Sequence, residues 1–203
     1  MGALRSNIDA AHAVHLCLDM QSLFGPNGPW PTPWLERVLP NVVSLVARDP
    51  ARTIFTRFMP PEQPDQAVGM WRLYFAKWND VTRSVIDPAL LDLLPALLAF
   101  SPPAHVFDKP AYSAFSNPRL HSFLQEKRVH TLVVSGTETD VCVLATVLAA
   151  VDLGYRVIVA KDALCSSTDQ THDALMTLYA QRFDLQIELA DCDEIIEAWS
   201  PVL

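Results

Sequence analysis

The alternation of short apolar runs with helix-like segments is the feature that most constrains the fold of this chain of 203 residues. Such alternation is typical of βαβ units, in which successive strands run parallel and helices cover the sheet. The apolar runs predict strands over residues 13–20, 52–56, 104–107, 131–135, 156–160 and 185–189. The segments between them predict helices over residues 33–47, 70–78, 118–126, 141–153, 170–182 and 191–199.

These elements predict an α/β fold with three layers, α/β/α, around a six-stranded, mostly parallel, Rossmann-like sheet. Right-handed crossovers place helices on both faces of such a sheet. Thr32 is expected to cap the first helix with Pro33 at its first position, and Gly154 is expected to end the helix over residues 141–153. Because the sequence shows neither a repeat nor a linker, residues 1–203 are expected to form a single domain.

Composition and charge narrow the class of partner. Apolar and aromatic residues make up 50% of the chain, and the formal net charge is -8. An acidic surface repels phosphate backbones, so we expect no nucleic-acid partner. The sequence shows neither a secretory leader nor a membrane-spanning run, and its four cysteines form no CxxC pair. We therefore expect a cytoplasmic protein with reduced thiols and no membrane partner.

Three chemically distinct side chains follow three of the predicted strands. Asp19 ends the first strand, Lys109 follows the third, and Cys142 lies a short turn after the fourth. The carboxyl ends of parallel strands meet at one edge of the sheet, where ligands bind. The sequence therefore predicts that a carboxylate, an amine and a thiol converge at this edge.

The predicted position of Cys142 at the start of a helix suggests a nucleophile. A helix N-terminus carries partial positive charge, and together with Lys109 it would stabilise a thiolate. Asp19 is placed to exchange protons with the thiol and with a leaving nitrogen. The alternative interpretation is that Cys142 is a small buried hydrophobe and Asp19 a turn residue. Cys165, in the expected loop after the fifth strand, is the rival nucleophile.

Three segments of the chain together resemble the isochorismatase-like cysteine hydrolases, relatives of nicotinamidase and N-carbamoylsarcosine amidohydrolase. They are Leu18–Asp19–Met20–Gln21, then Asp108–Lys109–Pro110, then the run from Val133 to Val143. The resemblance extends from about residue 13 to residue 199. It implies that Asp19, Lys109 and Cys142 form a catalytic triad.

The same resemblance implies further features of the site. A non-proline cis peptide is expected between Thr137 and Glu138, and the amides of Glu138 and Cys142 are expected to form the oxyanion hole. Members of this superfamily assemble as dimers or tetramers, so a homo-oligomer is expected. Nicotinamidases carry an Asp-x-His-x5-His metal segment, whereas residues 56–61 here contain no histidine. We therefore expect no metal and no other cofactor, and we disfavour nicotinamide as the substrate.

The substrate is expected to be a small molecule held largely by aromatic side chains. The residues expected to contact it are Phe24, Phe58, Trp71, Tyr112, Phe115 and Glu138. The favoured function is metal-independent hydrolysis of a C–N bond in a small amide, ureide or carbamoyl compound through a thioester. One alternative is enol-ether hydrolysis with Asp19 as general acid and Cys142 as a bystander. The other is a non-catalytic binding protein on the same fold.

Overall fold

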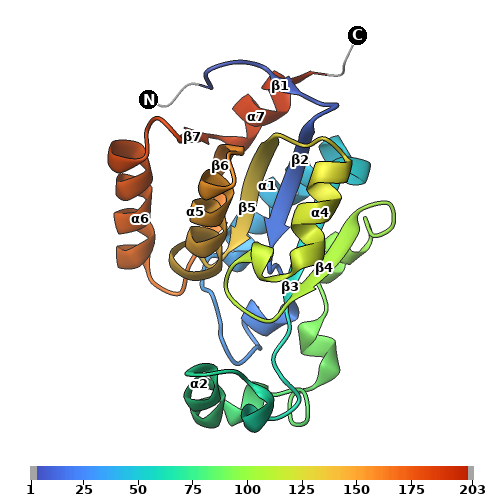
Figure 1. The fold of residues 1–203 in the computed structure, drawn as a ribbon, viewed down its shortest axis with the longest axis vertical. Coiled ribbons are helices and arrows are strands. Elements are labelled where there is room, and N and C mark those ends of the chain that lie inside the picture. The colour runs from blue at the N-terminus through green and yellow to red at the C-terminus, as the bar shows by residue number, and fades with distance from the viewer. Residues whose placement is uncertain (1–3, 201–203) are drawn as a thin grey trace.

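A computed structural model describes residues 4–200 and contains the predicted sheet (Figure 1). Its six strands lie in the order β4-β3-β2-β5-β6-β7, and every neighbouring pair is parallel. The predicted fold class is therefore confirmed. The strands are β2 (Ala13–Leu18), β3 (Thr53–Phe58), β4 (His105–Lys109), β5 (Thr131–Thr137), β6 (Arg156–Cys165) and β7 (Ile187–Ala190).

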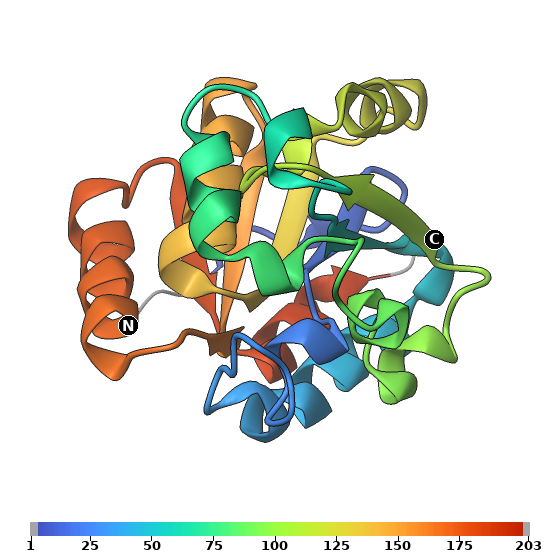
Figure 2. The same cartoon turned by 90° about the horizontal axis from the view of Figure 1, so that it is seen from below.

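Helices cover both faces of the sheet and bury a separate core on each (Figures 1 and 2). One face carries α1 (Leu35–Arg48) and α7 (Cys192–Ala198), and the other carries α4 (Pro118–Glu126), α5 (Leu144–Asp152) and α6 (Asp169–Arg182). Strand β2 is buried along its whole length because its alternate side chains enter opposite cores. Within residues 4–200, none of the helices is long and apolar enough to cross a membrane.

The first helix begins later than predicted. It starts at Leu35 with Trp34 in the capping position, and no side chain caps it. The N–H of Leu35 is instead bonded to the backbone carbonyl of Thr32. The Thr32 hydroxyl is buried and lies 3.5 Å from the hydroxyl of Thr137. The predicted cap is therefore wrong, because a backbone turn supplies the acceptor and the side chain faces the interior.

Some elements were not predicted. β1 (Ile8–Asp9) pairs with β8 (Trp199–Ser200) in a separate two-stranded parallel sheet near the ends of the chain. A short helix, α3 (Pro95–Leu98), precedes β4. The predicted aromatic helix is present as α2 (Trp71–Lys77), and it lies beyond the carboxyl ends of the strands (Figure 1). This position places the aromatic side chains of α2 near the predicted site.

Candidate active site

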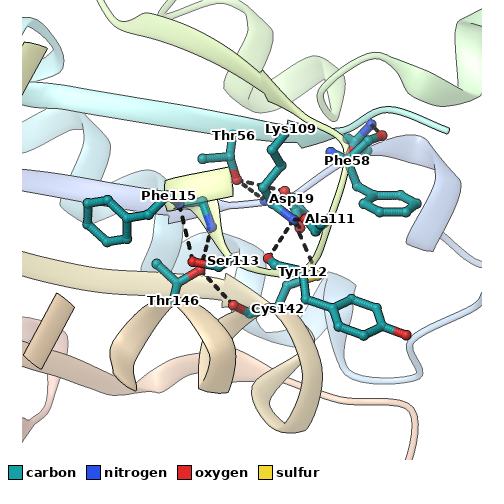
Figure 3. A network of polar contacts seen from close by, with 12 residues as sticks. Asp19, Thr56, Phe58, Lys109, Ala111, Tyr112, Ser113, Phe115, Cys142 and Thr146 are labelled. Carbon is teal, nitrogen blue, oxygen red and sulfur yellow. Dashed lines mark hydrogen bonds and ion pairs between the residues drawn. The ribbon is translucent and has the colours of Figure 1, made fainter. Parts of the chain in front are cut away.

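The ends of β2 and β4 and the turn after β5 bring Asp19, Lys109 and Cys142 into contact (Figure 3). The Nζ atom of Lys109 lies 2.7 Å from Oδ2 of Asp19. The same ammonium donates to Sγ of Cys142 at 3.4 Å. The side chains of Asp19 and Lys109 are 0% exposed, and Cys142 is 5% exposed. The structure thus places the three side chains together, as the order of the strand ends predicted.

A sharp turn at the end of β2 aims the Asp19 carboxylate. Asp19 has φ 51°, in the left-handed region that aspartate tolerates better than most residues. Its N–H donates to the carbonyl of Thr56 at 3.2 Å. The Thr56 hydroxyl donates to Oδ1 of Asp19 at 2.6 Å. One carboxylate oxygen is therefore bonded to β3, and the other is left to face the ammonium.

The ammonium of Lys109 is held by the loop that follows its own strand. It donates to the carbonyl of Ala111 at 3.0 Å and to the carbonyl of Tyr112 at 2.8 Å. Nζ also lies 5.3 Å from the centre of the Phe58 ring. Because backbone carbonyls and the Asp19 carboxylate surround it, the ammonium has a fixed position beside the thiol.

The turn that carries Cys142 depends on Gly136. This residue has φ 114°, and a Cβ atom there would lie 2.1 Å from the carbonyl oxygen of Leu18. Only glycine lets β5 approach β2 this closely. The peptide bond between Thr137 and Glu138 is cis. The chain then leaves the sheet and enters the turn that carries Cys142.

Cys142 lies in a π-helical turn, Thr139–Val143, that precedes α5. The sequence predicted a regular helix from residue 141, so the structure differs in the first turn. Such turns are frequent at functional sites. The Thr146 hydroxyl donates to the carbonyl of Cys142 at 2.7 Å and accepts from the N–H of Ala114 at 2.9 Å. Thr146 therefore joins the turn that carries Cys142 to the loop that holds Lys109 (Figure 3).

The charges of the site favour an ammonium beside a protonated thiol. Burial raises the pKa of Cys142, the Asp19 charge raises it further, and Lys109 lowers it by less. Burial lowers the pKa of Lys109, but its interactions with Asp19 and Cys142 outweigh burial, so the net pKa is raised. The direction of this shift runs against the expectation of a resting thiolate, because Cys142 is buried and its one cation is shared with a carboxylate.

A cavity of about 470 Å³ opens beside Cys142. Half of the residues that line it are aromatic: Phe24, Trp30, Phe58, Tyr74, Trp78 and Tyr112. Glu138, Val141 and Ser167 line it beside the thiol. This volume suits a small organic molecule, and apolar walls with a few polar groups are typical of ligand sites.

Residues 13–191 match the family model of the isochorismatase domain. The chain belongs to the isochorismatase family of hydrolases. A probable inactive nicotinamidase of Arabidopsis thaliana is 30% identical over 142 residues, covering 68% of this chain and 72% of that protein. Nicotinamidase 3 of the same plant is 26% identical over 184 residues, covering 90% and 86%.

Two solved structures share the fold of the chain. A cysteine hydrolase from Pseudomonas syringae pv. phaseolicola 1448A superposes with a TM-score of 0.84 at 23% identity, covering 98% of this chain and 97% of that one. N-carbamoylsarcosine amidase from Thermoplasma acidophilum superposes with a TM-score of 0.71 at 19% identity, covering 89% and 96%. At these identities the likeness describes the fold of this isochorismatase-family chain alone.

Four of the residues predicted to bind substrate line the cavity, namely Phe24, Phe58, Tyr112 and Glu138. Trp71 and Phe115 do not. The Trp71 ring packs edge-on behind Tyr112, at 4.8 Å between centres, and lines a neighbouring cavity of about 520 Å³. The Phe115 ring stacks on Tyr155 at 6.0 Å and points away from Cys142 in Figure 3.

Sequence reasoning missed several residues of the cavity wall, including Trp30, Val141 and Ser167. Trp30 lies in a loop rich in proline and glycine, where the sequence has no periodicity to indicate a direction. The available signal was its nearness in sequence to Asp19. Of the four cysteines, only Cys142 lines the cavity among the described residues. Cys165 is buried at the end of β6 and does not line the cavity, so a ligand held there would meet Cys142 and not Cys165.

One cluster of side chains within residues 4–200 has the geometry to hold a metal ion, and it lies away from the cavity. It consists of Asp9, His12 and His130, whose ligand atoms lie within 4.8 Å of one another. His12 and His130 precede β2 and β5, so this cluster is at the amino-terminal edge of the sheet. The Nδ1 atom of His12 lies 2.8 Å from the Asp9 carboxylate. The positions of these two histidines in the sequence did not indicate that they would lie close together.

Proposed function

We propose that this protein is a metal-independent cysteine hydrolase that cleaves the C–N bond of a small amide, ureide or carbamoyl compound through a thioester. The observation that carries the proposal is the contact among Asp19, Lys109 and Cys142 at the base of the aromatic cavity. A thiol, a proton acceptor and a fixed cation in one buried place are the parts that nucleophilic acyl transfer requires. The amide and carbamoyl compounds named for nicotinamidase 3 and N-carbamoylsarcosine amidase support this substrate class.

The first half of the proposed cycle forms the thioester. Asp19 takes the thiol proton as Sγ of Cys142 attacks the carbonyl carbon. The Lys109 ammonium, 3.4 Å from Sγ, stabilises the charge that develops on sulfur. This charge interaction is strong because burial excludes water. The backbone amides of Glu138 and Cys142 are proposed to hold the oxyanion.

The second half of the cycle releases the products. Asp19 returns the proton to the leaving nitrogen, and the C–N bond breaks. Water then enters, and Asp19 takes its proton as it attacks the thioester. The proton goes back to Sγ when the acid leaves, so the triad regains its starting charges. Each proton moves between named atoms of the chain and the substrate, so the proposed cycle needs no metal step.

The release of ammonia from a panel of small primary amides tests this function. We expect Cys142→Ala to lower kcat/KM by at least about a thousandfold, because it removes the nucleophile. Cys165→Ala is the matched control, since it removes a buried thiol outside the cavity. Full activity in Cys142→Ala, or an equal loss in both variants, would show that the mechanism is wrong. Dialysis against a chelator should leave the rate unchanged.

We also propose that the protein acts as a homo-oligomer, a dimer or a tetramer, in a reducing compartment such as the cytoplasm. Exposed apolar side chains around α2, namely Val68, Met70 and Leu73, support a surface that associates. All four cysteines are free, which supports a reducing environment. Light scattering on the purified protein measures the oligomeric state, and a monomer at micromolar concentration would exclude it.

A further inference from the structure

Trp30 is the centre of an aromatic box on the wall of the cavity. Its ring centre lies 5.8 Å from that of Trp78, 6.0 Å from Phe58, 6.1 Å from Tyr74 and 6.2 Å from Phe24. The Trp78 ring stands edge-on to Trp30, at 85° between the two planes. These rings come from the loop after β2, the end of β3 and α2, so three separate segments build one box.

The charged side chain that a ligand in this cavity would meet is negative. Among the described residues that line it, none is Lys, Arg or His, and Glu138 is the single carboxylate. Lys109 lies beneath and is occupied by Asp19, the thiol and two carbonyls. Lys77 lies over the Trp78 ring at 5.4 Å but is exposed.

The charge of Glu138 influences the pKa values of two tyrosines that line the cavity. Burial is the main cause that raises the pKa values of Tyr74 and Tyr112, and the charge of Glu138 raises both further. Burial also raises the pKa of Glu138 itself, Ser167 opposes this shift by hydrogen bonding, and Asp140 and Asp19 add to it. Among residues 4–200, no cationic side chain pairs with Glu138, so the cavity wall carries a carboxylate without a positive partner.

Ring faces and a carboxylate both attract positive charge. A ring face carries the negative part of the aromatic quadrupole, and boxes of such rings hold quaternary ammonium groups. A substrate carboxylate in the same place would lose its hydration without gaining a cation. We infer that the substrate carries a cationic head, a quaternary or protonated amine, which the Trp30 box and Glu138 hold while its amide carbon reaches Cys142. This inference rests on the proposed function for the identity of the reacting group.

Three amides of equal length test the inference by binding. They are the primary amide of a trimethylammonium-substituted butyric acid, its tert-butyl isostere in which carbon replaces nitrogen, and the amide that ends in a carboxylate. Calorimetry with the Cys142→Ala protein measures their dissociation constants without turnover. We expect the ammonium compound to bind about tenfold more tightly than its isostere, and the carboxylate to bind most weakly. Equal binding of the ammonium and tert-butyl compounds, or tightest binding of the carboxylate, overturns the inference.

Two variants in the Cys142→Ala background assign the preference to the box. Trp30→Leu removes the central ring, and Glu138→Gln removes the charge with little change in volume. We expect each variant to lower the ratio of ammonium to isostere affinity to about threefold or less. The matched controls are Trp34→Leu and Glu126→Gln, which lie outside the cavity and should keep the tenfold ratio. A ratio that stays at tenfold in both box variants overturns the assignment.

Turnover by the unmodified protein tests the proposed function independently of these binding measurements. Hydrolysis of these amides without a preference for the cation would leave the proposed function standing and remove the inference. Preferred binding of the cation without hydrolysis of any amide would do the opposite. The two failures are therefore distinguishable in the same set of compounds.

Discussion

The buried ion pair between Lys109 and Asp19 predicts a large loss of stability when one partner is removed. Lys109→Met keeps the aliphatic part of the side chain but leaves the Asp19 carboxylate without its partner at 2.7 Å. Both side chains are 0% exposed, so water cannot replace the ammonium. Removing one partner of a buried pair typically lowers the free energy of unfolding by about 3–5 kcal/mol. We expect a loss of this size for Lys109→Met.

A double-mutant cycle separates the pair from its surroundings. Asp19→Asn alone leaves a buried ammonium, whereas Lys109→Met with Asp19→Asn leaves neither charge. The double variant should therefore lose about 2–3 kcal/mol less than the sum of the two single losses. This coupling energy is the signature of a charged pair, because two neutral neighbours in contact would couple weakly.

Equilibrium unfolding in urea near neutral pH measures these losses. With a slope of about 2–3 kcal/mol/M, the expected loss for Lys109→Met lowers the midpoint by about 1–2.5 M. Arg57→Met is the control, since it removes two ion pairs, with Asp108 and Asp92, whose side chains are 46% and 54% exposed. Each exposed pair of that kind contributes about 0–1 kcal/mol. A Lys109→Met loss no larger than that of Arg57→Met would refute the picture of a buried, charged pair.

Three further predictions address the turn, the core and the thiol. Gly136→Ala places a methyl group 2.1 Å from a backbone oxygen and should lower the free energy of unfolding by more than about 3 kcal/mol. The control is Gly154→Ala, where φ is 83° and the space around the residue is open; it should lower the free energy of unfolding by only about 1–2 kcal/mol. Equal losses of stability for the two variants in urea would contradict the crowding at Gly136. Burial lowers the pKa of His15 from 6.5 to about 3. Between these pH values the unfolded chain binds a proton at His15 and the folded chain does not, so the free energy of unfolding should fall as the pH falls through this window. His15→Gln should flatten this fall, and an unchanged pH profile of the unfolding midpoint would count against a buried neutral imidazole. Because burial raises the pKa of Cys142, iodoacetamide should alkylate it more slowly than free cysteine near neutral pH and faster as the pH rises. Fast alkylation with no pH dependence, measured by peptide mass spectrometry, would instead indicate a preformed thiolate.

The sheet and the convergence of the triad could be predicted because both follow from strand patterning. Strands buried on both faces read as continuous apolar runs, and parallel strands end at a common edge. Asp19, Lys109 and Cys142 therefore come together once six strands and their direction are known. The two-residue strands β1 and β8 carry no such pattern, so their pairing depends on where the ends of the chain meet.

The cavity and the protonation of the site could not be predicted in the same way. Trp30 enters the wall through a loop whose path is set by packing against Phe58 and Trp78. Phe115 follows Lys109 closely in sequence, but the turn Ala114–Ser116 directs its ring to the opposite core. The thiol was expected to ionise at a helix tip, and its burial beside a carboxylate reverses that expectation. Each outcome depends on neighbours that are distant in sequence.

Intact-protein mass spectrometry of samples quenched with acid during the first turnover tests the proposed thioester most directly. With an amide that the protein hydrolyses, we predict a mass increase equal to the acyl group, located on the peptide that contains Cys142 and absent from Cys142→Ala. Hydrolysis by a protein whose Cys142 stays unmodified throughout the first turnover would contradict nucleophilic attack by sulfur. It would instead favour direct acid catalysis by Asp19 with the thiol as a bystander.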